Sequence, residues 1–101
     1  MTVSNLIGGV WRDGDAWTSV IHPFTDAVID QVAVATAEQV EDAIAAAHAS
    51  MSDLAALTAH DRAQILRTIA GRIDDDLEAL SATLSAEAGK PIGQALSLIH
   101  I

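Results

Sequence analysis

Few residues of this chain have the types and spacing that chemistry needs. Gly89-Lys90 matches the end of a phosphate-binding loop, which supplies backbone N–H groups and a lysine to a nucleotide phosphate. That loop also needs a glycine five residues before the Gly-Lys pair and a Ser or Thr after it. The chain has Leu84 and Pro91 at these positions, so a phosphate loop is excluded.

Histidine and aspartate side chains could bind a metal, but their spacing argues against a metal centre. The histidines are too scattered for a zinc pair of the HExxH type, and we interpret them as exposed or cap-adjacent side chains. They are His22, His48, His60 and His100. Asp74-Asp75-Asp76 has the oxygen ligands that a divalent cation prefers, but consecutive helix residues point in different directions. We therefore expect the three aspartates to form a solvated helix start.

Two tryptophans, Trp11 and Trp17, are candidates for a ligand platform or for the packing pair of a hairpin. Aromatic residues make up only 3% of the chain, so large apolar side chains are scarce. Packing between the tryptophans is therefore the favoured interpretation.

Composition excludes several classes of function. The 101 residues carry 5 Lys+Arg against 14 Asp+Glu, and the net charge of −9 repels phosphate backbones, which predicts no nucleic-acid partner. No apolar run approaches the length of a membrane span, which predicts no membrane partner. The N-terminus lacks a secretory signal, so we expect a cytoplasmic protein. The chain has no Cys, which excludes disulfides and a cysteine nucleophile among these residues.

Hydrophobic periodicity places strands first and helices after them. Strands are predicted within residues 6–34, over 6–11, 17–21 and 28–34, with a hairpin turn at Asp13-Gly14 and a second turn around Pro23. At Thr36 the apolar period changes from two to 3.6 residues, which predicts helices over 37–51, 59–74 and 76–88.

Local residue chemistry marks the ends of these helices. Thr36 with Gln39 forms a capping box, and Thr58 with Asp61 forms a second cap-like pair. Gly89 stands where the third helix should stop. Taken alone, these residues describe an acidic α+β unit without a catalytic set. A stand-alone acidic helical interaction module and a small-molecule domain that uses the tryptophans both stay open.

The order and spacing of five segments resemble those of NAD(P)-dependent aldehyde dehydrogenases. None of the segments is specific by itself, but all five occur in the family's order. They are residues 6–11 (LIGGVW, like INGxW), 20–26 (VIHPFTD, like V-x-NPATG), 41–47 (EDAIAAA, like VDxAVxAA), 62–73 (RAQILRTIAGRI, like RxxxLxxIAxxI) and 87–92 (EAGKPI, like E-x-GKP). The chain departs from the family pattern at Gly9, His22 and Asp26.

The resemblance implies an α/β fold that begins the Rossmann-like cofactor domain of a larger, homo-oligomeric enzyme. In that family a cysteine thiolate attacks the aldehyde, hydride passes to NAD or NADP, and a Glu activates water to release the acid. None of these groups lies in this chain, so it is expected to hold no catalytic and no cofactor-binding residue and to be inactive alone. The EAGKPI segment is similar to that of members acting on small phosphorylated or hydroxylated aldehydes, such as phosphonoacetaldehyde or lactaldehyde.

The resemblance also implies a metal site for a monovalent cation, sodium or potassium. Family members bind this ion with backbone carbonyls before the turn and with the acid of the GKP segment. These positions are Val20, Ile21 and Glu87 here. Carbonyl and carboxylate oxygens suit such a hard ion.

The last six residues, 96–101, leave the family pattern abruptly. LSLIHI is also the in-frame translation of a transposon-type sequencing-adapter end. We therefore expect residues 1–95 to be the N-terminal part of an aldehyde dehydrogenase domain and residues 96–101 to be an adapter artefact.

Overall fold

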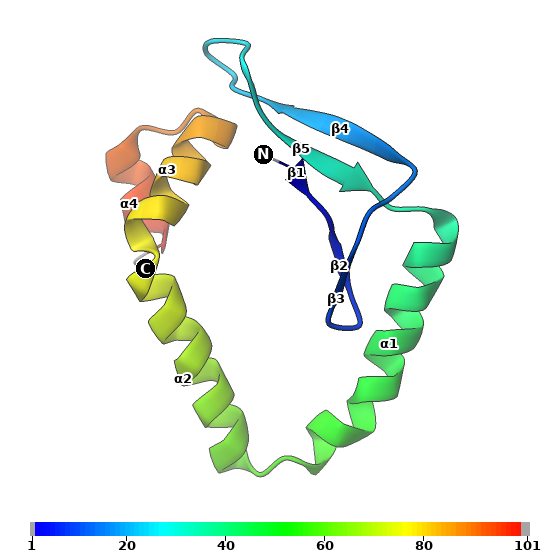
Figure 1. Ribbon diagram of the computed structural model, residues 1–101. Coiled ribbons are helices and arrows are strands. Elements are labelled where there is room, and N and C mark those ends of the chain that lie inside the picture. Colours follow the sequence, from blue (N-terminus) through cyan, green and yellow to red (C-terminus); the bar gives the residue numbers. More distant parts are fainter. Residues whose placement is uncertain (1, 100–101) are drawn as a thin grey trace. The chain divides into compact units, whose positions relative to one another are not determined.

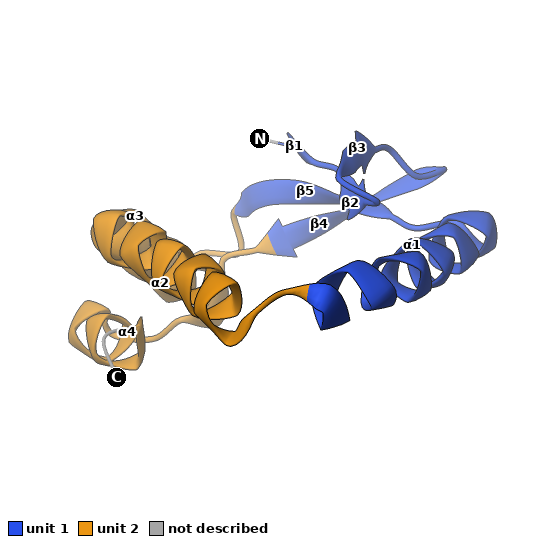
Figure 2. Cartoon of the chain, turned by 90° about the horizontal axis from the view of Figure 1, so that it is seen from below, with its two compact units in different colours: residues 1–20, 28–56 blue, residues 21–27, 57–101 orange. Residues whose placement is uncertain are grey.

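The computed structural model describes residues 2–99, in which there are five strands and four helices (Figure 1). The chain forms two compact units (Figure 2). Unit 1 comprises residues 1–20 and 28–56, and unit 2 comprises residues 21–27 and 57–101. Helix and strand are mixed, as the predicted α/β class requires.

Unit 1 contains a three-stranded sheet and a two-stranded hairpin. The sheet has the order β1-β5-β4, where β1 is Thr2–Val3, β4 is Ala16–Ile21 and β5 is Val28–Val34. Strands β1 and β5 are parallel. The hairpin consists of the antiparallel strands β2, Asn5–Ile7, and β3, Val10–Arg12.

The predicted position of the hairpin turn was wrong. The turn is Gly8-Gly9, which joins β2 to β3 with φ of 57° and 80°, the positive values that a two-residue type I′ turn needs at both positions. Gly14 does not have a positive φ. A glycine is needed there because the backbone of Val34 lies so close that an added Cβ would be 1.8 Å from its oxygen. The predicted strand over 6–11 is therefore two short strands.

Helix α1, Ala37–Ala56, follows β5 and begins at the predicted capping box. The Gln39 amide donates to Thr36 Oγ1, and the Thr36 amide donates to Gln39 Oε1, both at 3.1 Å. The helix continues five residues beyond the predicted end at Met51. No Gly or Pro interrupts this segment before Thr58 caps the next helix.

Unit 2 contains helices α2, Ala59–Asp75, and α3, Leu77–Ala88, within one residue of the predicted bounds. The amide of Asp61 donates to Thr58 Oγ1 at 3.1 Å, as the second capping pair predicts. Asp76 closes α2 and opens α3, whereas Asp74 and Asp75 lie in the last turn of α2, so the predicted helix start holds for Asp76 alone. Gly89 ends α3 in the left-handed conformation with φ of 69°.

A fourth helix, α4 or Ile92–Ile99, was not predicted. The carbonyl of Pro91 accepts from the amides of Gln94 and Ala95 and so starts the helix. Helix α4 packs against α3, with Ala95 and Ser81 fully buried. Residues 96–99 of this helix belong to the segment predicted to be an adapter artefact, and residues 100 and 101 lie outside the described part of the chain.

The buried apolar core of the described residues is small and consists of Ile7, Ala33 and Ala95. The apolar stripes of the helices are exposed, with Ile44 and Met51 on α1 at 60% and 62% and Leu66 on α2 at 67%. Within residues 2–99, no helix has both the length and the apolar character of a membrane span.

Candidate functional site

The turn between β4 and β5 is the first element of the predicted cation site. Its ends are joined because the His22 amide donates to the Ala27 carbonyl and the Asp26 amide donates to the His22 carbonyl, both at 2.9 Å. Asp26 adopts φ of 58°, a left-handed conformation that Asp tolerates better than most residues. The turn therefore holds the residue after Ile21 in a fixed conformation.

The His22 side chain folds back onto this turn. Its Nδ1 accepts from the amides of Phe24, at 3.2 Å, and Thr25, at 3.3 Å. An Nδ1 that accepts requires the neutral ring to carry its proton on Nε2. The ring thus does what an Asn or Asp oxygen does in an Asx turn, where it accepts from the backbone two residues on.

The end of α3 is the second element of the predicted site. Glu87 is exposed in the last turn of α3, and the Gly89 amide donates to the Ser85 carbonyl at 2.9 Å. An added Cβ at Gly89 would lie 2.9 Å from Pro23 Cγ, so the turn lies directly against the end of the helix. Gly89 is required here both for its φ and for this close approach.

The predicted ligands are distributed unequally between the units. Ile21 and Glu87 both belong to unit 2, whereas Val20 is the last residue of the first segment of unit 1. A backbone carbonyl and a carboxylate are hard oxygen donors, and the end of a helix adds partial negative charge. In unit 2, the contact of Pro23 with Gly89 brings the turn that follows Ile21 to the end of the helix that carries Glu87.

The other histidines and the aspartates of residues 74–76 are the side chains whose spacing argued against a metal centre. His48 on α1 and His60 on α2 are exposed, as expected, and His100 lies outside the described residues. Asp74, Asp75 and Asp76 are exposed at the joint of α2 and α3. In the described part of the chain, no group of three or more His, Cys, Asp or Glu side chains could hold a metal ion.

The tryptophans belong to different sheets, so the hairpin pairing was wrong. Trp11 on β3 is paired with Leu6, and Trp17 lies on β4. Trp11 lines a hollow with Thr2, Val3 and Ser4. A second hollow lies between the β2–β3 hairpin and α1, lined by Leu6, Ile7, Gly8, Gly9, Ala43, Ala46, Ala47 and Ser50. Neither hollow has a charged lining residue, so neither offers a carboxylate, imidazole or amine as an acid or base.

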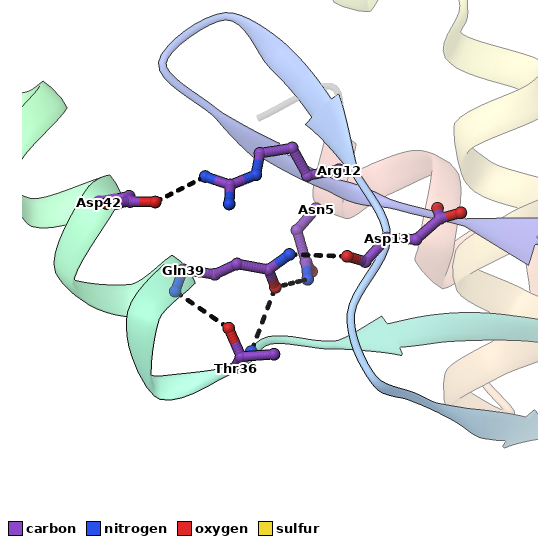
Figure 3. Close-up of polar contacts among 6 residues, drawn as sticks. All are labelled: Asn5, Arg12, Asp13, Thr36, Gln39 and Asp42. Carbon is purple, nitrogen blue, oxygen red and sulfur yellow. Dashed lines mark hydrogen bonds and ion pairs between the residues drawn. The ribbon is translucent and has the colours of Figure 1, made fainter.

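Gln39 is the centre of a polar cluster that the sequence predicts only in part (Figure 3). Its side chain is 5% exposed, and its Nε2 donates to the Asp13 carbonyl at 2.6 Å. Its Oε1 accepts from Asn5 Nδ2 at 3.5 Å besides the capping bond. Arg12 pairs with Asp42 at 2.8 Å beside this cluster. The capping box identified the bond to Thr36, but no local signal identifies Asp13, 26 residues away.

Comparison with known sequences identifies the family of this chain. Residues 11–100 match the pattern of the aldehyde dehydrogenase family. The lactaldehyde dehydrogenase of Escherichia coli (strain K12) is 40% identical over 80 residues, which are 79% of this chain and 16% of that protein. An aldehyde dehydrogenase of Rhodospirillum rubrum is 38% identical over 96 residues, which are 92% of this chain and 19% of that protein.

Solved structures agree with the sequence comparison. An aldehyde dehydrogenase from Physcomitrella patens, in complex with the reaction product succinate, superposes with a TM-score of 0.93 at 30% identity, over 98% of this chain and 21% of that one. A betaine aldehyde dehydrogenase from Staphylococcus aureus, in complex with NAD+, gives a TM-score of 0.91 at 27% identity, over 96% and 20% of the two chains. The chain thus spans about a fifth of the length of these relatives. The family match covers β4, β5 and helices α1 to α4, and the chain belongs to the aldehyde dehydrogenase family.

Proposed function

We propose that this chain is the N-terminal part of an oxidoreductase that oxidises an aldehyde to a carboxylic acid with NAD or NADP. The observation that carries the proposal is the family match over residues 11–100. Relatives named for aldehyde oxidation, and a relative solved with NAD+, support the reaction and the cofactor. A small hydroxylated aldehyde is the proposed substrate class, since the lactaldehyde dehydrogenase of Escherichia coli is 40% identical.

Within that enzyme the role of this chain is structural. The reaction needs a thiolate nucleophile, and the chain contains no Cys. The hollows in unit 1 have no charged lining residue. The exposed stripes of α1 and α2 give the rest of the enzyme apolar surfaces to cover. We therefore assign no catalytic and no cofactor-binding residue to residues 1–95, and we regard 96–101 as an adapter artefact.

A site for sodium or potassium formed by the Val20 and Ile21 carbonyls and the Glu87 carboxylate is part of the proposal. Its support in unit 2 is the oxygen chemistry of Ile21 and Glu87 and the contact of Pro23 with Gly89. The ion would supply positive charge to fix the turn beside the end of α3. A homo-oligomeric, cytoplasmic enzyme completes the proposal.

Sequencing the gene past codon 95 and assaying its product tests the reaction. The expected result is a continuing frame with a Cys-bearing segment, whose product reduces NAD or NADP when lactaldehyde is added. The 101-residue chain is expected neither to reduce the cofactor nor to bind it in a calorimetric titration. A natural stop codon at this point would favour the alternative, a stand-alone acidic interaction module. Tight cofactor binding by the chain alone would refute the structural role.

A further inference from the structure

The conformation of the turn between β4 and β5 depends on one side chain. His22 is half-buried, and its Nδ1 is the acceptor for both the Phe24 and the Thr25 amides. Without that acceptor, two backbone donors at the start of the turn lose their partner. The remaining bonds must also hold Asp26 at a φ of 58°, which costs an L-residue free energy.

The turn links Ile21 to the end of α3. Ile21 precedes His22 directly, and Pro23 follows it and lies against Gly89, two residues beyond Glu87. The conformation of His22 therefore sets both the direction of the Ile21 carbonyl and the position at which Pro23 packs. Within unit 2, the contact of Pro23 with Gly89 joins the turn to the end of the helix that carries Glu87.

We propose that His22 is a positioning residue, whose Nδ1 holds the turn in the conformation that presents the Ile21 carbonyl beside the end of α3. The imidazole acts as a hydrogen-bond acceptor, and it does not itself contact the ion. The purpose of this positioning rests on the cation site proposed above, whereas the positioning itself does not. Any side chain that returns an acceptor to the same two amides should replace His22, and one without an acceptor should not.

Hydrogen exchange of the Phe24 and Thr25 amides in the 101-residue chain tests the positioning without any ion. His22→Ala should lower the protection factors of both amides roughly tenfold, since each loses its acceptor. His22→Asn should restore them, because Asn oxygen accepts from the same backbone positions in an Asx turn. In the unaltered chain, ring ¹⁵N shifts should identify Nδ1 as the unprotonated nitrogen. His48→Ala, at an exposed histidine on α1, is the matched control and should change neither amide.

The outcomes separate this proposal from the cation site. Equal protection in His22→Ala and the unaltered chain, or no rescue by His22→Asn, would overturn the positioning role. The ion is tested apart, by comparing the thermal shift in sodium or potassium chloride with that in choline chloride at equal ionic strength. A cation-specific shift that His22→Ala loses and His22→Asn keeps supports both proposals. If exchange behaves as expected but no cation shift occurs, the positioning role stands and the cation site fails.

Discussion

Replacing Gln39 by Glu separates what the capping box predicts from what the fold adds. Glu and Gln serve equally at this position of a capping box, so the sequence pattern alone predicts a neutral change. In the structure, Oε1 and Nε2 of Gln39 make hydrogen bonds of opposite direction to different partners. Oε1 accepts from the Thr36 amide, and Nε2 donates to the Asp13 carbonyl at 2.6 Å (Figure 3). A carboxylate keeps the first bond and turns the second into a contact between two acceptors.

The magnitude follows from these contacts. Leaving the part-buried Asp13 carbonyl without its donor costs about 1–3 kcal/mol. The negative charge returns about 0.3–1 kcal/mol at the N-terminus of α1. Gln39→Glu should therefore lower the free energy of unfolding by about 1–2 kcal/mol at neutral pH. Gln39→Ala loses these two side-chain bonds and the bond from Asn5 Nδ2, and it should cost about 2–4 kcal/mol.

Acidification should reduce the penalty of Gln39→Glu, because a protonated carboxyl can donate to the Asp13 carbonyl as Nε2 does. The contact with that carbonyl should raise the pKa of the introduced carboxyl in the folded state above its ordinary value of about 4.3. A raised folded-state pKa means that stability is lost as pH rises from the unfolded to the folded pKa. The difference between variant and unaltered chain should thus shrink as pH falls through that window.

Urea unfolding measures both effects. The fluorescence of Trp11 and Trp17 reports on unit 1, and far-UV circular dichroism reports on the helices of both units. Sucrose in the buffer favours the folded state at the start of each titration. Gln64→Glu is the matched control, at an exposed position of α2, and should change the free energy of unfolding by less than about 0.5 kcal/mol. If Gln39→Glu is as neutral as Gln64→Glu at neutral pH, the bond to Asp13 does not stabilise the fold.

Three further substitutions test close approach and buried polarity. Gly14→Ala places a Cβ 1.8 Å from the backbone oxygen of Val34 and should cost about 3 kcal/mol or more, seen as loss of cooperative urea unfolding; near-normal stability would refute the packing of Gly14. Gly89→Ala places a Cβ at a residue with φ of 69° and against Pro23, so it should lower the free energy of unfolding by about 1–3 kcal/mol. Circular dichroism should show this loss as a lower melting temperature, and an unchanged melting temperature would contradict it. Ser81→Ala removes a fully buried hydroxyl that has no hydrogen-bond partner among the described residues. Ser81→Ala should raise the free energy of unfolding by about 1 kcal/mol, which would appear as a higher urea midpoint. A lower midpoint would show that Ser81 Oγ has a hydrogen-bond partner.

The starts of α1 and α2 and the end of α3 were predictable because the interactions that set them span few residues. Thr36 and Gln39 meet within a single helical turn, and Thr58 and Asp61 do the same. Gly89 needs only its own φ to end α3. Such contacts depend on spacing along the chain, so the sequence contains all the information that they require.

The misplaced hairpin shows where local information ends. Asp13-Gly14 and Gly8-Gly9 are both turn signals, and nothing within either pair decides between them. The choice comes from distant contacts, since Val34 leaves no room for a Cβ at Gly14 and the Asp13 carbonyl accepts from Gln39. The candidate site likewise combines residues that are distant in the sequence. Val20, Ile21 and Glu87 were identified from a family pattern, because no local rule connects residues so far apart.

The small core and the polar cluster together explain which perturbations should matter most. With few buried apolar groups in the described residues, burial contributes little to stability, and individual hydrogen bonds and close contacts weigh more. The exposed stripe of α1 has the spacing of a helix face that is normally buried. If a larger enzyme covers that face, the added burial should make the fold tolerate losses such as Gln39→Ala. The cost of these substitutions to the isolated chain is then a measure of how much of its stability comes from the polar contacts around Gln39.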